Sequence, residues 1–434
     1  MRNDSSLCRQ RIDYGTHPVS ARRGGNDVPT QEPPLAGVRV IDVGTRISAP
    51  FCAGLLGEMG ADVIKIEDPR GGDFMRGVGP FLHTEDGSDY SLWWAVEGRG
   101  RRGVTLDLRT PSGQDLFRRL TSSADVVCEN FRPGTLEAWG IAPDDCDPNL
   151  VWARISVFGQ EGPYSDRPGL DRMGIAYGGL LNLTGFPDRP PVRPGVTISD
   201  YLTGVFAAQA VLAALYARDK SAGRTSQEGG AVVDASLYGA ILRVMEWTLA
   251  GQDVLGVTRE RQGNRLSTSA PVDNYPTSDG KYISIVGGSD ANFARLCRAM
   301  GQTELASDPE WTTLAKRAQR SDVINDIVAA WTASLPAEQI ERICIEHGVP
   351  VATALNAMEI LNNKHMQERG DFVTVDDSVA GPHLQQAPFP RFKGTPPVTP
   401  SSAPLLGEHN REVWCDLVGL TPSELETLID QGII

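Results

Sequence analysis

The sequence predicts a mixed α/β protein with a doubly wound parallel sheet and a second, smaller α/β region. Short apolar runs alternate with helical segments between residues 38 and 157, the order that builds a parallel sheet. A second α/β alternation covers residues 265–355. The chain has 434 residues, 40% of them apolar and 22% charged, which suits a globular protein of two or more domains.

The strands of the main sheet are predicted from short apolar runs. A helix over residues 50–59, started by Pro50, follows the first run, and a helix over residues 112–122 follows the third. Pro69 and the glycines after it end the second run. The predicted strands are residues 38–42, 62–67, 104–108, 124–128 and 150–157.

Beyond residue 200 the pattern changes to one long apolar helix and a separate α/β unit. Residues 201–218 form the helix, in which small side chains allow close packing, and residues 219–230 form a polar loop with glycines. The second unit contains a strand at residues 282–286 and helices near residues 291–300, 311–333 and 337–347.

These elements divide the chain into five segments. The predicted segments are a flexible N-terminal extension (1–34), a large domain (35–225), a linker and helix (226–264), a small α/β domain (265–355), and a return linker with a C-terminal segment that completes the large domain (356–434).

Charge and composition exclude several classes of function. The formal net charge is −14 and the pI is about 5.0, whereas nucleic-acid binding needs a basic surface. No apolar run reaches the ~20 residues of a membrane span, and the N-terminus lacks the apolar core of a secretory signal. Neither the seven cysteines nor the six histidines have the spacing of a disulfide framework or a metal site. We therefore expect a cytoplasmic protein without nucleic-acid, membrane or metal partners.

Residues 98–103 match the spacing G-x-G-x-x-G, but a strand follows them where a dinucleotide-binding loop would open a helix. A nicotinamide cofactor is therefore rejected. Arg99, Arg101 and Arg102 still place cations where a phosphate could bind, and a solvated basic turn is the alternative.

Residues 129–134 follow the fourth strand, where ligands bind in open α/β sheets. Their Asn-Phe-Arg sequence suits an adenine nucleotide, and an ordinary strand-to-helix loop is the alternative.

Asp200 lies immediately before the long apolar helix. Aspartate is a common cap at this position. The same position would also hold a carboxylate ionised near backbone N–H groups, and an ionised carboxylate is a competent nucleophile toward an acyl group. Asp171 is a second candidate, as a turn or cap residue or as a neighbour of Asp200 in one cleft.

Six short motifs, in this order along the chain, resemble the family III CoA-transferases, which include formyl-CoA and carnitine CoA-transferases and α-methylacyl-CoA racemase. They are residues 35–42, 60–67, 72–76, 104–108, 129–134 and 403–409. The resemblance runs from about residue 35 to the C-terminus. It implies a Rossmann-like large domain that binds CoA, a smaller α/β domain, and a homodimer of two interlocked chains.

The resemblance also implies an activity and a site. It makes Asp200 the catalytic aspartate, which would carry CoA from an acyl-CoA donor to a carboxylic acid acceptor through an aspartyl anhydride and an aspartyl-CoA thioester. Acyl-CoA is then a substrate, and no tightly bound cofactor is expected. The positions where the family contacts CoA, followed by three arginines added from charge and position, are Arg101, Asn130 and Phe131, then Arg46, Arg76 and Arg132.

Three departures from the family pattern bear on specificity. The racemases have a histidine, and formyl-CoA transferase a tyrosine, where this chain has Leu170. Formyl-CoA transferase has a glutamine in place of Ile47, and its glycine-run lid is represented only by Gly263-Asn264. These departures argue against oxalate and formate as substrates. The alternatives are a 2-methylacyl-CoA racemase or epimerase, and an inactive CoA-binding protein.

Overall fold

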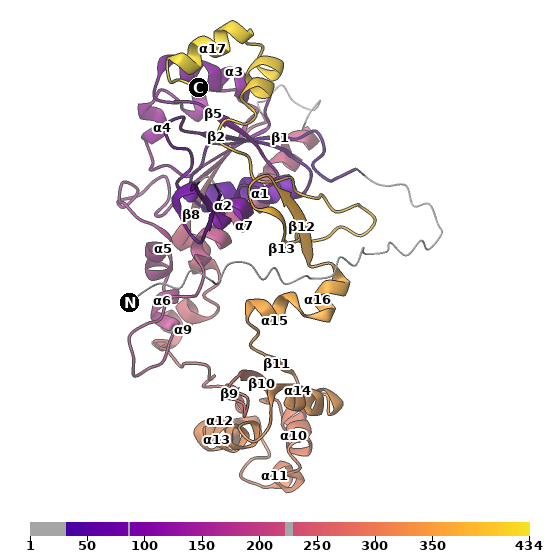
Figure 1. The fold of residues 1–434 in the computed structure, drawn as a ribbon. Coiled ribbons are helices and arrows are strands. Elements are labelled where there is room, and N and C mark those ends of the chain that lie inside the picture. The colour runs from indigo at the N-terminus through magenta and orange to yellow at the C-terminus, as the bar shows by residue number, and fades with distance from the viewer. Residues whose placement is uncertain (1–31, 86, 222–228) are drawn as a thin grey trace, which may run out of the picture.

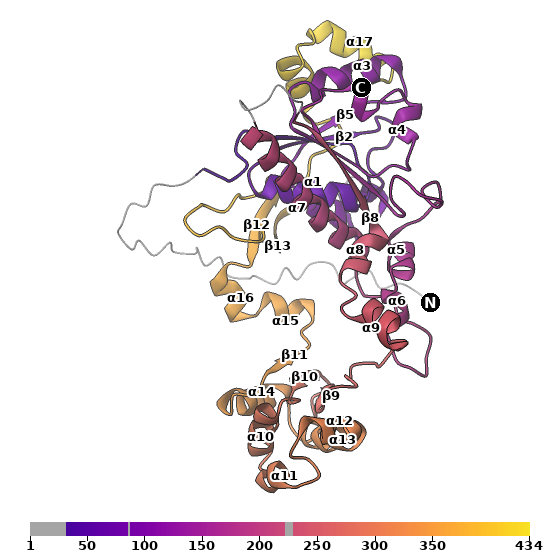
Figure 2. The same cartoon turned by 180° about the vertical axis from the view of Figure 1, so that it is seen from behind.

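The computed structural model describes residues 32–85, 87–221 and 229–434. Most of the predicted N-terminal extension (1–34) and most of the predicted loop 219–230 lie outside the described residues. The chain forms a large body around a parallel sheet and a small body at the opposite end of the molecule, joined by two connecting segments (Figure 1). The view from behind shows the same two bodies (Figure 2).

The large body is built on a six-stranded parallel sheet in the order β5-β2-β1-β6-β7-β8. The order reverses between β1 and β6, as in a doubly wound Rossmann-like sheet, which confirms the predicted fold class. The strands are β1 (Arg39–Asp42), β2 (Asp62–Glu67), β5 (Arg102–Thr105), β6 (Val126–Glu129), β7 (Val151–Ser156) and β8 (Ala231–Ser236).

Two strands differ from the sequence prediction. The third strand begins two residues earlier than predicted and ends at Thr105, because residues 106–110 turn toward the next helix. Strand β8 lies in the segment predicted as a linker and helix (226–264). It is the edge strand, half-exposed along its length, and therefore lacks the continuous apolar run that identifies a buried parallel strand.

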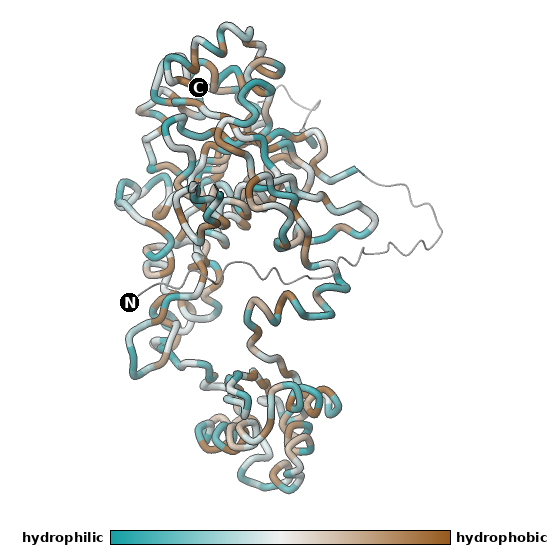
Figure 3. The backbone as a smooth tube through the Cα atoms, viewed as in Figure 1, coloured by the Kyte–Doolittle hydropathy of each residue, from teal (hydrophilic) through white to brown (hydrophobic). Residues whose placement is uncertain are grey.

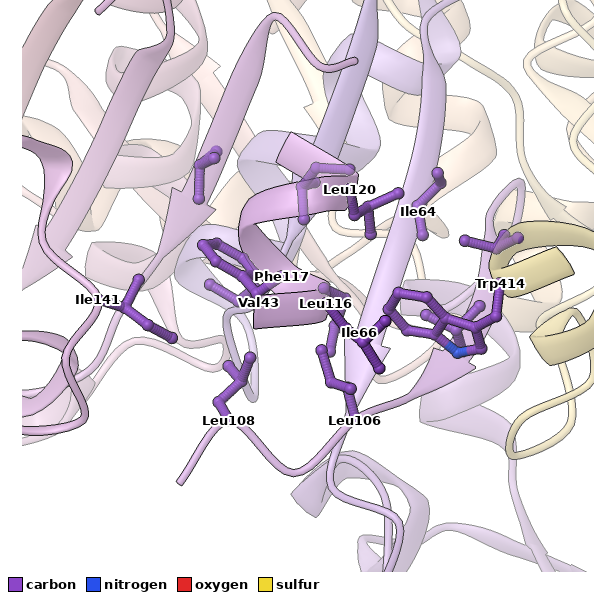
Figure 4. Close-up of a cluster of buried hydrophobic side chains, with 14 of the residues drawn as sticks. Val43, Ile64, Ile66, Leu106, Leu108, Leu116, Phe117, Leu120, Ile141 and Trp414 are labelled. Carbon is purple, nitrogen blue, oxygen red and sulfur yellow. The ribbon is translucent and has the colours of Figure 1, made fainter. Parts of the chain in front are cut away.

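Helices cover both faces of this sheet. On one face α1 (Ser48–Glu58) and α7 (Ile198–Ser221) pack on β1, β6 and β7. On the other, α3 (Pro111–Thr121) packs on β1 and β2, and Figure 4 shows Phe117 and Leu120 of α3 facing the strands. Helix α7 is long and apolar enough to cross a membrane by composition, but it packs against α1, β7 and β8 as a core helix.

The C-terminal segment returns to the large body and covers the other edge strand, β5. His409 donates its backbone N–H to Gly103 O (2.9 Å), and Asn410 Oδ1 accepts from the backbone N–H of Thr105 (2.8 Å). Trp414 then packs beside Ile66 in the same cluster as α3 (Figure 4). The motif at residues 403–409 therefore protects a sheet edge that would otherwise expose unpaired backbone groups.

The small body has an antiparallel sheet in the order β11-β10-β9, with a core of its own. Figure 3 shows apolar stretches in its interior as well as in the main sheet. The single helix predicted at residues 311–333 is two helices that meet at Arg320, whose backbone leaves the helical region. Its elements are β9 (Val272–Pro276), β10 (Tyr282–Val286), β11 (Val351–Thr353), α10 (Asp290–Ala299), α11 (Thr303–Ser307), α12 (Leu314–Gln319), α13 (Ser321–Thr332) and α14 (Ala337–Glu346).

The remaining elements connect these parts. Around the site they are η1 (Phe74–Gly77), β3 (Phe81–His83), β4 (Asp89–Ser91), α2 (Leu92–Glu97), α4 (Thr135–Ala138), η2 (Pro143–Asp145), α5 (Asp171–Tyr177) and α6 (Leu180–Leu183). Toward and from the small body they are α8 (Leu237–Arg243), α9 (Thr248–Leu255), α15 (Ala357–Leu361), α16 (Lys364–Arg369), β12 (Phe372–Asp377) and β13 (Gly381–Gln386). The C-terminal segment on the large body contains the π-helical turn η3 (Glu412–Leu417) and α17 (Pro422–Asp430).

Candidate functional site

The loop that follows β1 is held by Asn130, which follows β6. Asn130 Oδ1 accepts the backbone N–H of Thr45 (2.8 Å), and its Nδ2 donates to the carbonyl oxygen of Thr45 (2.7 Å) and to Ser48 Oγ (3.0 Å). The two strands are neighbours at the point where the strand order reverses, so their loops meet there. Asn130 therefore fixes the loop that leads into α1.

Arg46 is the central residue of this loop. Its φ is +67°, a left-handed conformation that costs free energy for a residue other than glycine. Its backbone N–H donates to Asp73 Oδ1 (3.1 Å), and its guanidinium stacks on the half-exposed ring of Phe74, 3.6 Å from the centroid. Within the described part of the chain, Arg46 makes no ion pair.

Asp200 lies in the first turn of α7, and a second carboxylate caps that helix. Asp171 Oδ1 accepts the backbone N–H of Ser199 (2.9 Å), the Oγ–H of Ser199 (2.9 Å) and the backbone N–H of Asp200 (3.4 Å). The interpretation of Asp200 as the helix cap is therefore wrong, because Asp171 supplies the cap oxygen. The backbone N–H groups of Ser199 and Asp200 are likewise already bonded.

The environment of Asp200 opposes its ionisation. Burial, followed by the neighbouring charge of Asp171, raises the pKa of Asp200 from its ordinary value of 3.8 to about 7, and the charge of Arg46 acts in the opposite direction. No hydrogen bond to its carboxylate is found among the described residues. Asp200 is thus a carboxylate that changes charge near neutral pH and has free oxygen lone pairs.

Packing between α1 and α7 brings Arg46 to the side of Asp200. The rings of Phe51 and Tyr201 meet edge to face with centroids 4.8 Å apart. A Cβ on Gly204 would lie 2.9 Å from the carbonyl oxygen of Ser48, so the first turns of the two helices touch. Ile47, the residue after Arg46, lies in one apolar cluster with Tyr201.

Tyr201, the residue after Asp200, is anchored on its other side. Its hydroxyl donates to Glu97 Oε1 (2.7 Å) and accepts from Trp93 Nε1 (3.4 Å). Burial raises the pKa of Glu97, and the hydrogen bond from Tyr201 partly offsets that increase. The first turn of α7 is therefore fixed by hydrogen bonds at Ser199 and at Tyr201, on either side of Asp200.

A buried network of charges lies beneath the Arg46 loop. Lys65 Nζ lies 3.1 Å from Asp73 Oδ2 and 3.5 Å from Asp42 Oδ1, and it donates to the carbonyl oxygen of Gly44. Asp42 and Lys65 are fully buried. The network joins the carboxyl ends of β1 and β2 to the loop, and the sequence analysis did not identify it. The available signal was a lysine inside the apolar run of β2.

Arg101, a predicted CoA contact, also belongs to this network. Its Nη1 donates to Asp42 Oδ2 (2.7 Å) and its Nη2 to the carbonyl oxygen of Pro50 (2.6 Å), and the residue is 5% exposed. The other arginines of the basic turn pair as well, Arg99 with Glu58 and Arg102 with Asp62. This geometry favours a structural role for Arg101 over contact with a phosphate.

Arg76 is engaged in the same way. It makes a bidentate pair with Glu67 (2.7 and 2.8 Å), donates to the carbonyl oxygen of Pro404 (3.0 Å), and stacks on Trp94. Arg132, in contrast, is exposed, and among the described residues it has no carboxylate partner. Of the six predicted CoA contacts, Arg46 and Arg132 are therefore the arginines whose charge remains available.

A pocket of about 190 Å³ opens at the carboxyl ends of β1, β2, β5 and β6. Phe131 lines it and meets Trp139 edge to face, with centroids 5.2 Å apart. Thr45 and Asp73 line it too, whereas neither Arg46 nor Asp200 does. In residues 32–85, 87–221 and 229–434 no group of three metal-ligating side chains is arranged to hold a metal ion.

Comparison with known proteins identifies the family. The model of CoA-transferase family III matches residues 35–410. The chain belongs to this family. It is similar to the succinyl-CoA–D-citramalate CoA-transferase of Chloroflexus aurantiacus, with 42% identity over 92% of this chain and 98% of the relative. It is also similar to the succinyl-CoA–L-malate CoA-transferase beta subunit of the same organism, with 38% identity over 92% and 98% of the two chains.

A solved structure agrees with this assignment. A CaiB/BaiF family protein from Brucella suis superposes with a TM-score of 0.78 and 30% identity, covering 89% of this chain and all of that one. The predicted resemblance is confirmed, and the protein is a CoA-transferase that acts on acyl-CoA and carboxylic acids. In this CoA-transferase Asp200 and Asp171 lie at the start of α7, and the charge of Arg46 acts on Asp200. Asn130 and Phe131 lie at the carboxyl end of the central strand β6.

Proposed function

We propose that the enzyme transfers CoA from succinyl-CoA to a dicarboxylic acid through covalent intermediates on Asp200. The observation that carries the proposal is a carboxylate with free lone pairs, fixed in the first turn of α7, whose pKa lies near neutrality. Relatives named for succinyl-CoA and for hydroxylated dicarboxylic acids support the substrate class. We further propose that the enzyme is a cytoplasmic homodimer.

The reaction needs four acyl transfers that conserve the thioester. The Asp200 carboxylate attacks the donor thioester, which forms a mixed anhydride and releases the CoA thiolate. The thiolate attacks the aspartyl carbonyl, which releases the donor acid and leaves an aspartyl-CoA thioester. The acceptor carboxylate attacks this thioester, and the released thiolate then attacks the acceptor carbonyl. Asp200 is regenerated, and no ATP is required because one thioester replaces another.

The neighbours of Asp200 prepare it for this cycle. Asp171 fixes the first turn of α7 by accepting hydrogen bonds from Ser199, and its charge keeps Asp200 from being strongly stabilised as an anion. A poorly stabilised carboxylate is a better nucleophile than one held by several donors. Asp171 is thus a positioning residue in this proposal, and Asp200 is the catalytic residue.

CoA is proposed to bind at the pocket beside β1 and β6. Phe131 and Trp139 offer aromatic surface to the adenine, and Arg132 is an exposed cation at the same edge for a phosphate. Asn130 acts indirectly, through the loop that it holds. Arg101 and Arg76 stabilise the fold beneath the site, since Nη1 and Nη2 of Arg101 and the guanidinium of Arg76 are bonded to protein acceptors.

The racemase alternative lacks a second proton carrier. Inverting the carbon beside a thioester requires two acid/base groups on opposite faces. Leu170 stands where racemases have a histidine, and Asp171 is 6% exposed and bonded to Ser199. These observations support transfer over racemisation, and the retained Asp200 weighs against an inactive CoA-binding protein.

The proposal is tested with Asp200→Asn and an exposed control, Asp326→Asn. Asp200→Asn should abolish transfer and still bind free CoA, because an amide cannot attack the thioester. Wild-type enzyme treated with succinyl-CoA and then hydroxylamine should carry a hydroxamate on the peptide that contains Asp200. The control should behave as wild type. An active Asp200→Asn protein, with deamidation excluded by mass spectrometry, would end the covalent mechanism.

A further inference from the structure

Arg46 is held in position by its neighbours, but no carboxylate of the described residues pairs with its charge. Five other arginines of the large body pair with carboxylates of the chain: Arg76, Arg99, Arg101, Arg102 and Arg109. Arg46 makes no such pair among the described residues. One face of its guanidinium lies on Phe74, which leaves the N–H groups at its edge free to bind an anion.

The position of Arg46 is enforced at some cost. The backbone holds a left-handed conformation, fixed by Asp73 and, through the carbonyl oxygen of Gly44, by the buried Lys65. Strained non-glycine residues persist where the surrounding structure determines them, often at ligand sites. Phe74 is 53% exposed even with Arg46 stacked on its ring. The loop fixes the backbone of Arg46, and the ring of Phe74 fixes the orientation of its guanidinium group.

The charge of Arg46 acts on the nucleophile, and Arg46 does not line the pocket. Val43, Gly44 and Thr45 line the pocket at the sheet edge, and Arg46 does not. Arg46 instead lies where α1 meets α7, close enough for its charge to act on Asp200. The guanidinium therefore belongs to the surroundings of Asp200, where the acyl group of a thioester under attack would lie.

We propose that Arg46 binds the distal carboxylate of a dicarboxylic acyl group and so selects dicarboxylic over monocarboxylic substrates. The inference rests on the proposed function of Asp200. In a succinyl group the second carboxylate is separated from the thioester carbonyl by two methylene groups. In this proposal the thioester carbonyl lies at Asp200 and the second carboxylate lies at Arg46. A guanidinium binds a carboxylate through two parallel hydrogen bonds, which a methyl group in the same place cannot accept.

The test compares succinyl-CoA with butyryl-CoA, which has a methyl group in place of the distal carboxylate. In Arg46→Gln, the ratio of kcat/KM for succinyl-CoA to that for butyryl-CoA should fall by about 30- to 100-fold, the usual effect of losing one charged hydrogen-bonding partner. Arg46→Lys should give an intermediate ratio. The matched control is Arg320→Gln in the small body, which loses the same charge and a similar stacking contact, with Trp311.

A binding measurement separates this inference from the transferase mechanism. The nonreactive thioethers S-(3-carboxypropyl)-CoA and S-butyl-CoA are titrated by calorimetry into wild type and Arg46→Gln. Wild type should prefer the carboxylate analogue, and the variant should lose most of that preference. If Asp200→Asn stays active but these ratios change as stated, the mechanism fails and the role of Arg46 stands. If Arg46→Gln changes both thioesters equally, or neither, in both measurements, Arg46 does not read the distal carboxylate.

Discussion

Two aspartates at the start of α7 illustrate how environment divides roles between identical side chains. Asp171 is bonded to three donors and caps the helix, whereas Asp200 is bonded to none that the structure describes. Sequence position suggested the cap role for Asp200, because it precedes the apolar run. The family pattern implies a catalytic role for Asp200, which remains a proposal. The capping partner comes from 29 positions earlier in the chain, which no local pattern could reveal.

The pH dependence of activity should report the charges around Asp200. In wild type, kcat/KM should rise with pH through about 7 as Asp200 ionises. Asp171→Asn removes a negative charge that raises this pKa, so the rise should move to lower pH. The amide oxygen of the substituted side chain can still accept the hydrogen bonds that cap α7. A pH–rate profile of the two proteins checks the direction, and a rise that moves to higher pH would contradict it.

Asp200 should also lower the stability of the protein at neutral and alkaline pH. The unfolded chain ionises this carboxyl near 3.8 and the folded chain near 7, so between these values the folded state binds more protons. Its contribution to the free energy of unfolding is therefore lost progressively from pH 4 to pH 7. Asp200→Asn removes this effect and should gain up to about 4 kcal/mol at pH 8, at ~1.4 kcal/mol per pKa unit.

Thermal unfolding of Asp200→Asn at several pH values checks this sign. The gain in melting temperature should be largest at pH 8 and should shrink toward pH 6. Asp326→Asn, exposed on α13, provides the control for a lost surface charge. A gain that grows as the pH falls would show that the folded protein stabilises the ionised form of Asp200.

Arg101 should contribute more to the stability of the fold than to the affinity for CoA. Arg101→Ala leaves the buried Asp42 with Lys65 at 3.5 Å as its remaining cationic partner in the described structure, beside the backbone N–H of Gly44. Removing one partner of a buried ion pair costs about 3–5 kcal/mol. Denaturant unfolding should show this loss, while Arg70→Ala at an exposed pair should leave the midpoint unchanged. An Arg101→Ala protein of normal stability that binds CoA weakly would instead place Arg101 in the CoA site, as the sequence predicted.

At the scale of elements, the contact between α1 and α7 holds the site together. A Cβ at position 204 would lie 2.9 Å from the carbonyl oxygen of Ser48 and 3.0 Å from the ring of Phe51. Glycine inside a helix normally costs about 1 kcal/mol relative to alanine. Glycine is required here because a side chain at position 204 would collide with α1, so its absence permits the close contact of the two helices.

Gly204→Ala should therefore destabilise the protein and slow it, against the expectation from helix propensity. Forcing a methyl group against a backbone carbonyl costs about 1–3 kcal/mol, which exceeds the propensity gain. The separation of α1 from α7 should also lower kcat. The control is Gly195→Ala, since a Cβ there would meet nothing within 4 Å. A higher melting temperature for Gly204→Ala would show that the contact is loose.

The sheet was predictable from sequence where both faces of a strand are buried. The sequence predicts the strand at residues 62–67 with the bounds that the structure has, because an apolar run between glycine and proline has few alternatives. Strand β8 was missed because an edge strand is half-exposed. The pairing of Arg101 with Asp42 was also missed, since long-range ion pairs depend on which strands become neighbours.

At the scale of the whole molecule, the chain runs from the large body to the small body and then returns to the large body (Figure 1). The chain leaves the large body after α9, forms the small body, and returns through α15 and α16 to β12 and β13 (Figure 1). Large apolar side chains along this path face solvent, including Val254 at 75%, Leu255 at 73% and Phe389 at 76% exposed. Exposed apolar surface of this kind indicates a protein–protein contact.

We expect a second copy of the chain to cover these side chains in an interlocked homodimer, as the family resemblance implies. Each chain would pass between the two connecting segments of its partner, so the subunits could not part while folded. Light scattering should give one dimer mass across a dilution series. When tagged and untagged dimers are mixed under native conditions, no hybrid should form, whereas unfolding and refolding the mixture should give hybrids. An ordinary dimer would exchange subunits without unfolding, and a folded monomer at low concentration would exclude any obligate dimer.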